Sequence, residues 1–213
     1  KLFITPGVPE PASTFVPSFL SLEEISTAVS EGARLGIPTA AHCIGGQGLK
    51  DCIDGGVDVI EHMYMAAEQD VERLAASRCV VDLTSGIFLD PSREEFLSPA
   101  NALKVRLNRS RVRENVARII KARLPFVLGT DAYHGFLYRE VGYAVELGSD
   151  PVTAIQGVTS RAARVCRLED RIGKLENGME ADIIAVEGNP LEDVSRLSQV
   201  GLVMKGGVVY RQP

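Results

Sequence analysis

The stretch IPTAAHCIGGQGLKDCIDGGVDVIEH, residues 37–62, contains two short apolar segments separated by a short helical pattern. Residues 37–42 and residues 57–62 have the length and apolar character of buried strands, and each segment ends in a histidine. Residues 48–56 between them predict a short helix. A strand, a helix and a second strand in this order predict a βαβ unit, in which the two strands run parallel.

The same alternation continues on both sides of this stretch. Further strands are predicted over residues 79–84 and within PFVLGTD, residues 125–131. Helices are predicted over 21–36, 67–78, 100–123, 136–148 and 151–167, where Ser21 with Glu24 forms a capping box and Asp150 precedes a proline at the first helical position. Residues 85–99 form a polar segment that contains proline.

Two α/β architectures accommodate this rhythm, an open doubly wound sheet and a (β/α) barrel. The open sheet usually binds a nucleotide through a glycine-rich first turn, and the sequence contains neither GxGxxG nor GxxxxGK[ST]. Polar residues recur where the predicted strands end, which is typical of the site-bearing face of a barrel. The sequence therefore predicts an α/β fold of the TIM-type (β/α) barrel kind.

The pattern changes after about residue 170. The segments ADIIAVEGNP (181–190) and VGLVMKGGVVYR (200–211) are rich in β-branched residues, and Gly206-Gly207 marks the turn of a hairpin. We therefore expect two parts, a barrel part over residues 1–170 and an appended β-sheet segment over residues 171–213.

Composition narrows the class of protein. The 213 residues carry a net charge of -5 and no stripe of Lys or Arg, which argues against a nucleic-acid partner. No apolar run approaches the roughly 20 residues that cross a bilayer. The four cysteines are scattered and form no CxxC pair, which favours reduced thiols and a cytoplasmic protein. The opening KLFITPG reads as a strand already under way, so we expect a larger chain to precede it.

Three polar residues close three of the predicted strands. His42 and His62 end the strands of residues 37–62, and Asp131 follows FVLGT, with His134 three residues further on. The carboxyl ends of barrel strands share one face, so these side chains are expected to converge. Neutral imidazoles and a carboxylate suit Zn²⁺ or a similar ion. The alternative is that each histidine is structural and that Gly-Thr-Asp is only a turn.

The linked set of motifs resembles a known family. The segments are LGIPTAAHCIGGQGLKDCIDGGVDVIEH, LGTDA, the pattern G-x-x-x-x-G-x-x-A-D that begins at Gly173, and VMKGGVVYR. Together they resemble the carboxyl-terminal half of a metal-dependent amidohydrolase of the imidazolonepropionase-like or prolidase-like branch. The resemblance implies that the chain holds barrel strands four to eight.

The resemblance also implies roles for single residues. His42 and His62 match the histidine metal ligands of the fifth and sixth barrel strands. Asp131 matches the eighth-strand carboxylate, which is both a metal ligand and the catalytic general base and acid. Lys1 matches a fourth-strand lysine that is carboxylated and bridges two metal ions in many relatives, although an exposed lysine is the alternative.

The loop after Asp131 is expected to meet the substrate through Tyr133 and His134, although a surface histidine is an alternative for His134. The implied cofactor is a divalent metal, Zn²⁺ as one or two ions, with no nucleotide. The implied reaction is hydrolysis of an amide or other C–N bond by metal-bound hydroxide, with a cyclic amide, an N-acyl amino acid or a dipeptide as the small-molecule substrate. Neither a nucleic-acid nor a membrane partner is expected, and a homo-oligomer stays open.

The sequence departs from the family in two respects. It has no His-x-His pair of the kind that the family carries on its first strand, and Ile44 stands where prolidase-like relatives often place a tyrosine. The alternative is therefore a catalytically incomplete fragment or remnant that acts only as part of a larger chain or assembly. A metal-free (β/α) barrel isomerase or binding protein is a third reading.

Overall fold

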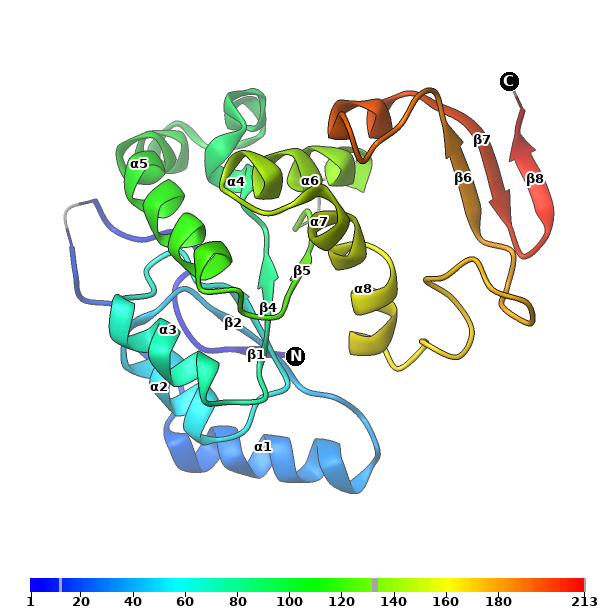
Figure 1. The fold of residues 1–213 in the computed structure, drawn as a ribbon. Coiled ribbons are helices and arrows are strands. Elements are labelled where there is room, and N and C mark those ends of the chain that lie inside the picture. The colour runs from blue at the N-terminus through cyan, green and yellow to red at the C-terminus, as the bar shows by residue number, and fades with distance from the viewer. Residues whose placement is uncertain (12, 132–133, 213) are drawn as a thin grey trace. The chain divides into compact units, whose positions relative to one another are not determined.

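The computed structural model of the chain describes residues 1–11, 13–131 and 134–212 (Figure 1). The chain divides into two compact units, the first over Lys1–Phe126 and the second over Val127–Pro213. All four cysteines are free thiols, and Cys166 alone among them is exposed. Within the described part of the chain, no helix is both long and apolar enough to cross a membrane.

The first unit is built on a sheet whose strands follow one another in chain order. The strands are β1 (Leu2–Phe3), β2 (Ala40–Cys43), β3 (Val59–His62), β4 (Val80–Leu83) and β5 (Phe126–Leu128), in the spatial order β1-β2-β3-β4-β5. Strand β5 starts at the last residue of the first unit and continues into the second. The pairs β1–β2, β2–β3 and β3–β4 are parallel. The βαβ unit predicted over residues 37–62 is confirmed, with each strand shorter than its predicted segment.

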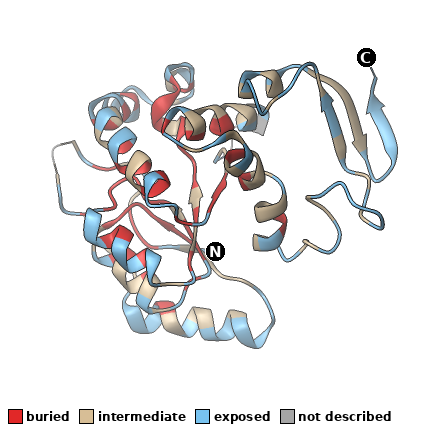
Figure 2. Ribbon diagram, in the orientation of Figure 1, coloured by how far each residue is buried: buried red, intermediate tan, exposed pale blue. Residues whose placement is uncertain are grey.

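Helices cover this sheet in the same sequential way. Helix α1 (Leu22–Arg34) is followed by α2 (Gly46–Asp54), α3 (Glu68–Ala75) and α5 (Pro99–Lys121), and each of these helices contacts the next (Figure 1). The capping box at Ser21 is confirmed, because its hydroxyl accepts from the Glu24 amide and the Glu24 carboxylate accepts from the Ser21 amide. Buried residues concentrate in the strands and on the helix faces turned toward them (Figure 2).

The polar segment after β4 is more ordered than its sequence indicates. It forms the short helix α4 (Gly86–Leu89) and the 3-10 helix η1 (Pro91–Phe96). The side chain of Arg109 on α5 donates to the carbonyl of Phe88 at 2.6 Å and pairs with Glu94. The arginines of residues 109–113 on a long helix predict a solvated face, and this prediction is wrong for Arg109, because its guanidinium satisfies polar groups of the preceding segment.

The second unit begins with helices. These are the 3-10 turn η2 (His134–Phe136), α6 (Leu137–Glu146), α7 (Pro151–Gly157) and α8 (Ser160–Val165). The Asp150 carboxylate caps α7 by accepting from the Thr153 amide at 2.8 Å, as the sequence predicts. The single helix predicted over 151–167 is wrong in its middle, because Thr159 has a non-helical backbone and its hydroxyl bonds to the carbonyl of Ile155.

A small antiparallel sheet completes the second unit. Its strands are β6 (Ile183–Val186), β7 (Val200–Lys205) and β8 (Val208–Arg211) in the order β6-β7-β8, with the 3-10 helix η3 (Val194–Ser198) between β6 and β7. Gly206 and Gly207 join β7 to β8 with φ values of 54° and 81°. Two successive positive φ values are what the tightest hairpin turn requires, so the predicted hairpin is confirmed.

Alanine at Gly45 should destabilise the chain more than alanine at Gly36. Both glycines have a positive φ, 149° and 70° respectively, which costs an L-residue roughly 1–2 kcal/mol. A Cβ at position 45 would lie 2.9 Å from the backbone of Met65, whereas one at position 36 meets nothing within 4 Å. Urea denaturation should therefore show that Gly45→Ala costs roughly 1–3 kcal/mol more than Gly36→Ala. Equal losses would contradict the close approach of these two loops.

Candidate active site

Two imidazoles lie side by side at the carboxyl ends of neighbouring strands. His42 lies near the end of β2 and His62 ends β3, and both are buried, with 6% and 3% of their surface exposed. Their ring centroids are 4.5 Å apart with an interplanar angle of 63°. The predicted convergence is thus present for the two histidines.

A backbone turn at His62 places its ring beside the ring of His42. Glu61 lies opposite His42 in the register of the two strands, so regular alternation would send His62 to the other face of the sheet. Instead His62 and Met63 have φ values of 78° and 54°. The His62 Nε2 atom consequently lies 3.7 Å from Oε2 of Glu61. Alternation along VDVIEH by itself predicts that Glu61 points away from His62, and this prediction is wrong because the strand leaves its regular geometry at His62.

Each imidazole is held by a hydrogen bond through one ring nitrogen. Nε2 of His42 lies 3.1 Å from the carbonyl oxygen of Pro6, and since a carbonyl only accepts, this nitrogen carries the proton. The ring of Phe3 stacks on His42 with centroids 4.0 Å apart. Nδ1 of His62 lies 2.7 Å from the hydroxyl of Thr84, which in turn lies 2.6 Å from the hydroxyl of Tyr64.

Sequence reasoning did not single out Thr84 or Tyr64 as partners of His62. The signal was present in the pattern, since Thr84 closes the strand segment 79–84 and Tyr64 stands two residues after a strand-end histidine. Nothing in the periodicity indicates that the two hydroxyls meet, because that contact depends on the turn at His62.

Burial keeps the His62 imidazole neutral. Loss of solvent around the ring lowers the pKa of His62 from 6.5 to about 3, and the nearby His42 and Lys1 add to the effect. At neutral pH the contact with Glu61 is therefore not an ion pair. A neutral imidazole is the form that binds a metal ion.

Lys1 approaches the same place from the neighbouring strand. Its Nζ lies 2.5 Å from Oε2 of Glu61, and its side chain is 53% exposed. Lys1 precedes Phe3 by two residues, and Phe3 pairs with His42 in the register of β1 and β2. The alternation of a strand therefore puts Lys1 on the same face as His42. Its part as a carboxylated metal ligand stays a prediction.

The other predicted residues belong to the second unit. Asp131 follows β5 in a turn, is exposed, and has a φ of 47°. Such a backbone is uncommon outside glycine and occurs preferentially at functional turns. His134 starts η2, but its side chain and the whole of Tyr133 lie outside the described residues. Their predicted contacts with substrate, and that of Asp131 with the histidines, stay predictions.

The donor atoms of the first unit fit part of a zinc-type site. Two imidazoles this close can share one ion, and Nδ1 of His42 is the ring nitrogen that is not used in the bond to Pro6. Among residues 1–11, 13–131 and 134–212, no group of three His, Cys, Asp or Glu side chains is arranged to hold a metal ion. Two imidazoles are fewer than the three or four protein ligands that zinc usually takes, so the histidine pair by itself is not a complete metal site.

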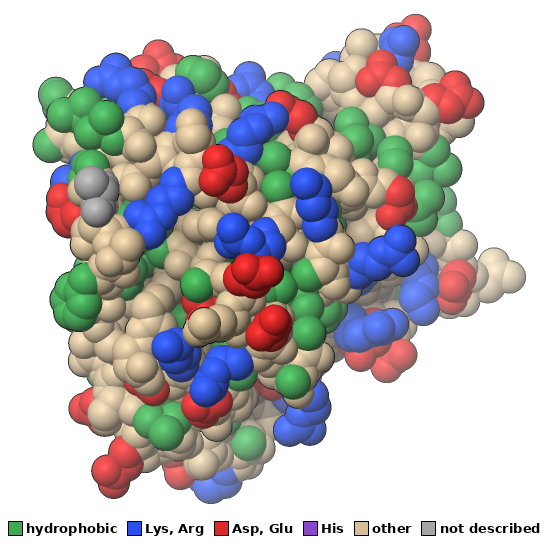
Figure 3. All heavy atoms as spheres, turned by 60° about the vertical axis from the view of Figure 1, so that its left-hand side comes forward, with side chains coloured by type: hydrophobic (Ala, Val, Ile, Leu, Met, Phe, Trp, Pro, Cys, Tyr) green, Lys and Arg blue, Asp and Glu red, His purple; other side chains and the backbone are tan. Residues whose placement is uncertain are grey.

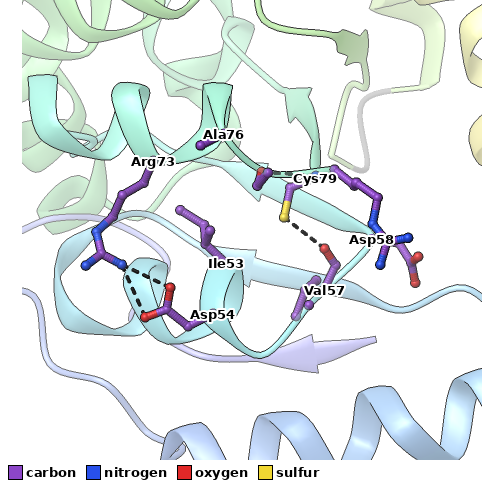
Figure 4. Close-up of a pocket in the computed structure, with 10 residues that line it drawn as sticks. Ile53, Asp54, Val57, Asp58, Arg73, Ala76 and Cys79 are labelled. Atoms are coloured by element: carbon purple, nitrogen blue, oxygen red, sulfur yellow. Dashed lines mark hydrogen bonds and ion pairs between the residues drawn. The ribbon is translucent and has the colours of Figure 1, made fainter.

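A separate hollow lies at the opposite end of the same strands. It has a volume of about 620 Å³ and is lined by residues that include Asp54, Val57, Arg73 and Cys79 (Figure 4). Val57 precedes β3 and Cys79 precedes β4, so this hollow is at the amino ends of the strands, where barrel proteins carry structural residues. Its polar lining is already occupied, since Arg73 binds Asp54 through both carboxylate oxygens and the Cys79 thiol donates to the Val57 carbonyl.

Charged side chains on the face drawn in Figure 3 do not mark a second site. On the face drawn in Figure 3, acidic and basic side chains are interspersed, and no large area has one sign. Many of these charges pair locally, as Arg34 does with Glu31 and Arg73 with Asp54. Exposed pairs of this kind contribute little to stability or recognition.

Comparison with known proteins identifies the class. Residues 13–210 match the model of the Amidohydrolase family. Since the match includes most of the chain, the protein belongs to this family. The resemblance carried by the histidine strands, LGTDA and the tail motif is thereby confirmed.

Individual relatives place the chain within that class. An ochratoxinase from Aspergillus niger is 33% identical over 212 residues, covering 92% of this chain and 43% of that protein. An imidazolonepropionase from Desulfotalea psychrophila is 23% identical over 179 residues, covering 79% of this chain and 38% of that protein. A Xaa-Pro dipeptidase crystallised with methionine in its active site has a TM-score of 0.86 at 30% identity, covering 98% of this chain and 53% of that one. The chain thus spans about half the length of these relatives.

Lowering the pH should destabilise the metal-free chain through His62. The unfolded chain binds a proton on this imidazole below pH 6.5, whereas the folded chain resists protonation down to about pH 3. The contribution of the neutral His62 to the free energy of unfolding is complete above pH 6.5 and is lost progressively as the pH falls toward 3. At pH 5 the expected loss is roughly 2 kcal/mol in the free energy of unfolding.

His62→Gln provides the control, because glutamine does not titrate. Urea denaturation in the presence of a chelator, at pH 7.5 and at pH 5, should show a steeper decline in stability for the wild type than for the variant. The same pH dependence in both proteins would contradict a buried neutral His62.

Proposed function

We propose that this chain supplies the carboxyl-terminal part of a metal-dependent hydrolase that cleaves an amide or other C–N bond. The observation that carries the proposal is the pair of buried histidines whose rings lie side by side at adjacent strand ends. Family membership supports it, and so do relatives named as an ochratoxinase, an imidazolonepropionase and a Xaa-Pro dipeptidase.

The proposed architecture is a TIM-type (β/α) barrel that contains strands four to eight here, with residues 171–213 as an appended segment. The strand order β1-β2-β3-β4-β5 supports a barrel, because it runs without the reversal that marks a doubly wound sheet. Successive contacts between α1, α2 and α3 along the sheet support the same winding.

In the proposed site His42 and His62 bind a divalent ion, Zn²⁺ by preference, because imidazole is a favoured ligand of zinc. Asp131 and a carboxylated Lys1 complete the ligands for one or two ions. An ion held here would supply Lewis acidity, which polarises a carbonyl group and makes hydroxide available near neutral pH. His134 and Tyr133, which follow Asp131 closely in the sequence, are the proposed substrate contacts.

Asp131 is the proposed proton carrier of the reaction. Its carboxylate accepts the proton of the attacking water and returns it to the leaving nitrogen, which is general base and then general acid catalysis. The turn with a φ of 47° supports this role, since a strained backbone that aims a carboxylate is a feature of functional sites. The buried imidazole of His62, whose pKa is lowered by burial, stays neutral and leaves this proton to the carboxylate.

Small amides are the proposed substrates. Cyclic amides, N-acyl amino acids and dipeptides all present a carbonyl bonded to nitrogen, which is the bond that the proposed chemistry breaks. The cytoplasm is the proposed location, which is supported by four cysteines that are all free thiols.

The decisive substitution is Asp131→Asn, which keeps the size of the side chain but removes its basicity. In the longest natural form of the protein supplied with Zn²⁺ or Mn²⁺, we expect turnover of the best amide in a panel to fall by roughly 10²-fold or more. Asp170→Asn is the matched control, because Asp170 is also exposed and lies in the same unit, outside the proposed site. Full activity in Asp131→Asn would contradict the mechanism, and so would an equal loss in both variants.

A further inference from the structure

The hydroxyl groups of Thr84 and Tyr64 form a buried chain of hydrogen bonds that ends at His62. Nδ1 of His62 lies 2.7 Å from Oγ1 of Thr84, and Oγ1 lies 2.6 Å from Oη of Tyr64. Oη also donates to the backbone carbonyl of Thr84 at 3.0 Å, and it lies 3.5 Å from Nδ1 of His62, the longest of these contacts. All three residues are at most 3% exposed, so each of these protons must find its partner inside the protein.

Counting the protons gives their direction. The Thr84 carbonyl only accepts, so the single proton of the Tyr64 hydroxyl is used in that bond. The proton between Oη and Oγ1 must then come from Thr84. Oγ1 has no second proton to offer, so the bond to His62 is donated by Nδ1. If instead Tyr64 donated to Thr84 and Thr84 donated to Nδ1, the bond from Tyr64 to the Thr84 carbonyl would be unmade and the imidazole proton would lie on Nε2.

The surroundings of Nε2 agree with this order. Oε2 of Glu61 lies 3.7 Å from Nε2, which is too long for a hydrogen bond. The same oxygen is taken by Nζ of Lys1 at 2.5 Å. The Glu61 carboxylate therefore does not accept a hydrogen bond from Nε2, and it does not stabilise a proton on that nitrogen.

We propose that Thr84 and Tyr64 are positioning residues that hold His62 as its Nδ1–H tautomer, so that the lone pair of Nε2 is presented to the metal ion. The inference rests on the metal-dependent function proposed above. In this role both hydroxyls act through His62. Their effect is to fix which nitrogen of His62 is the ligand, and partners of this kind commonly change metal affinity by about 10–100-fold.

Both hydroxyls are held in place by the rest of the first unit. Thr84 directly follows β4, the strand next to β3. The backbone carbonyl of Tyr64 accepts from Nδ2 of Asn115 on α5 at 2.8 Å, and the ring of Tyr64 packs on Phe88 with centroids 4.5 Å apart. The chain of bonds is therefore set by the fold and does not need a bound ion to form.

The test reads the tautomer directly. Nitrogen-15 NMR of the metal-free protein distinguishes a protonated from an unprotonated ring nitrogen, and the wild type should show His62 protonated on Nδ1. In Tyr64→Phe the Thr84 proton loses its acceptor and should turn to Nδ1, which moves the imidazole proton to Nε2. Zinc affinity, measured by competition with a chelator, should fall by about 10–100-fold in the same variant.

Two further variants keep the test sharp. Thr84→Ser retains the hydroxyl and should behave like the wild type, while Thr84→Val removes it and should lose the fixed tautomer and weaken zinc binding. Tyr210→Phe is the matched control, because Tyr210 is 72% exposed on β8 and should change neither reading.

The wild-type spectrum decides the proposal even if a variant fails to fold. A wild type that binds zinc but carries its proton on Nε2 would overturn the positioning role alone. An unchanged tautomer and affinity in Tyr64→Phe would do the same. A wild type with the expected tautomer that took up no zinc would instead overturn the proposed function, and the positioning role with it.

Discussion

The candidate site depends on one departure from strand geometry, the positive φ of His62 at the end of β3. A regular strand would place His62 on the face opposite Glu61 and His42. The left-handed turn at His62 and Met63 returns the imidazole to the side of His42 and brings their rings to 4.5 Å. Such a backbone costs on the order of 1–3 kcal/mol, so the surrounding structure must hold it in place.

Neighbouring elements supply that support. The amide of Met63 donates to the carbonyl of Cys43, and the amide of Met65 donates to the carbonyl of Ile44 at 2.6 Å, so the segments that follow β2 and β3 are joined. Helix α5 also binds the segment that follows β3. Asn115 donates to the carbonyl of Tyr64, and Arg118 donates to the carbonyl of Ala66 at 3.3 Å. The fold thus carries a strained, buried and neutral imidazole at the place where family membership implies a metal ligand.

Much of this arrangement follows from sequence, and the rest depends on contacts that sequence patterns do not encode. Apolar strand segments that end in histidine predicted the parallel sheet and the paired imidazoles, and together with LGTDA and the tail motifs they predicted the family. Period-two alternation gave the wrong orientation for Glu61, because no pattern in VDVIEH announces a left-handed residue at its end. The role of Arg109 was missed because its partners, Phe88 and Glu94, lie in a segment that reads only as polar. The hydroxyls of Tyr64 and Thr84 meet only after β3 and β4 have paired.

The most direct test of the central claim is to locate the metal ion. Crystals of the protein grown with Zn²⁺ should show an anomalous-scattering peak at the zinc absorption edge. The account predicts that this ion lies about 2.0–2.1 Å from a ring nitrogen of both His42 and His62. A zinc ion bound elsewhere while both imidazoles stay uncoordinated would contradict the assignment of these two histidines as the metal pair.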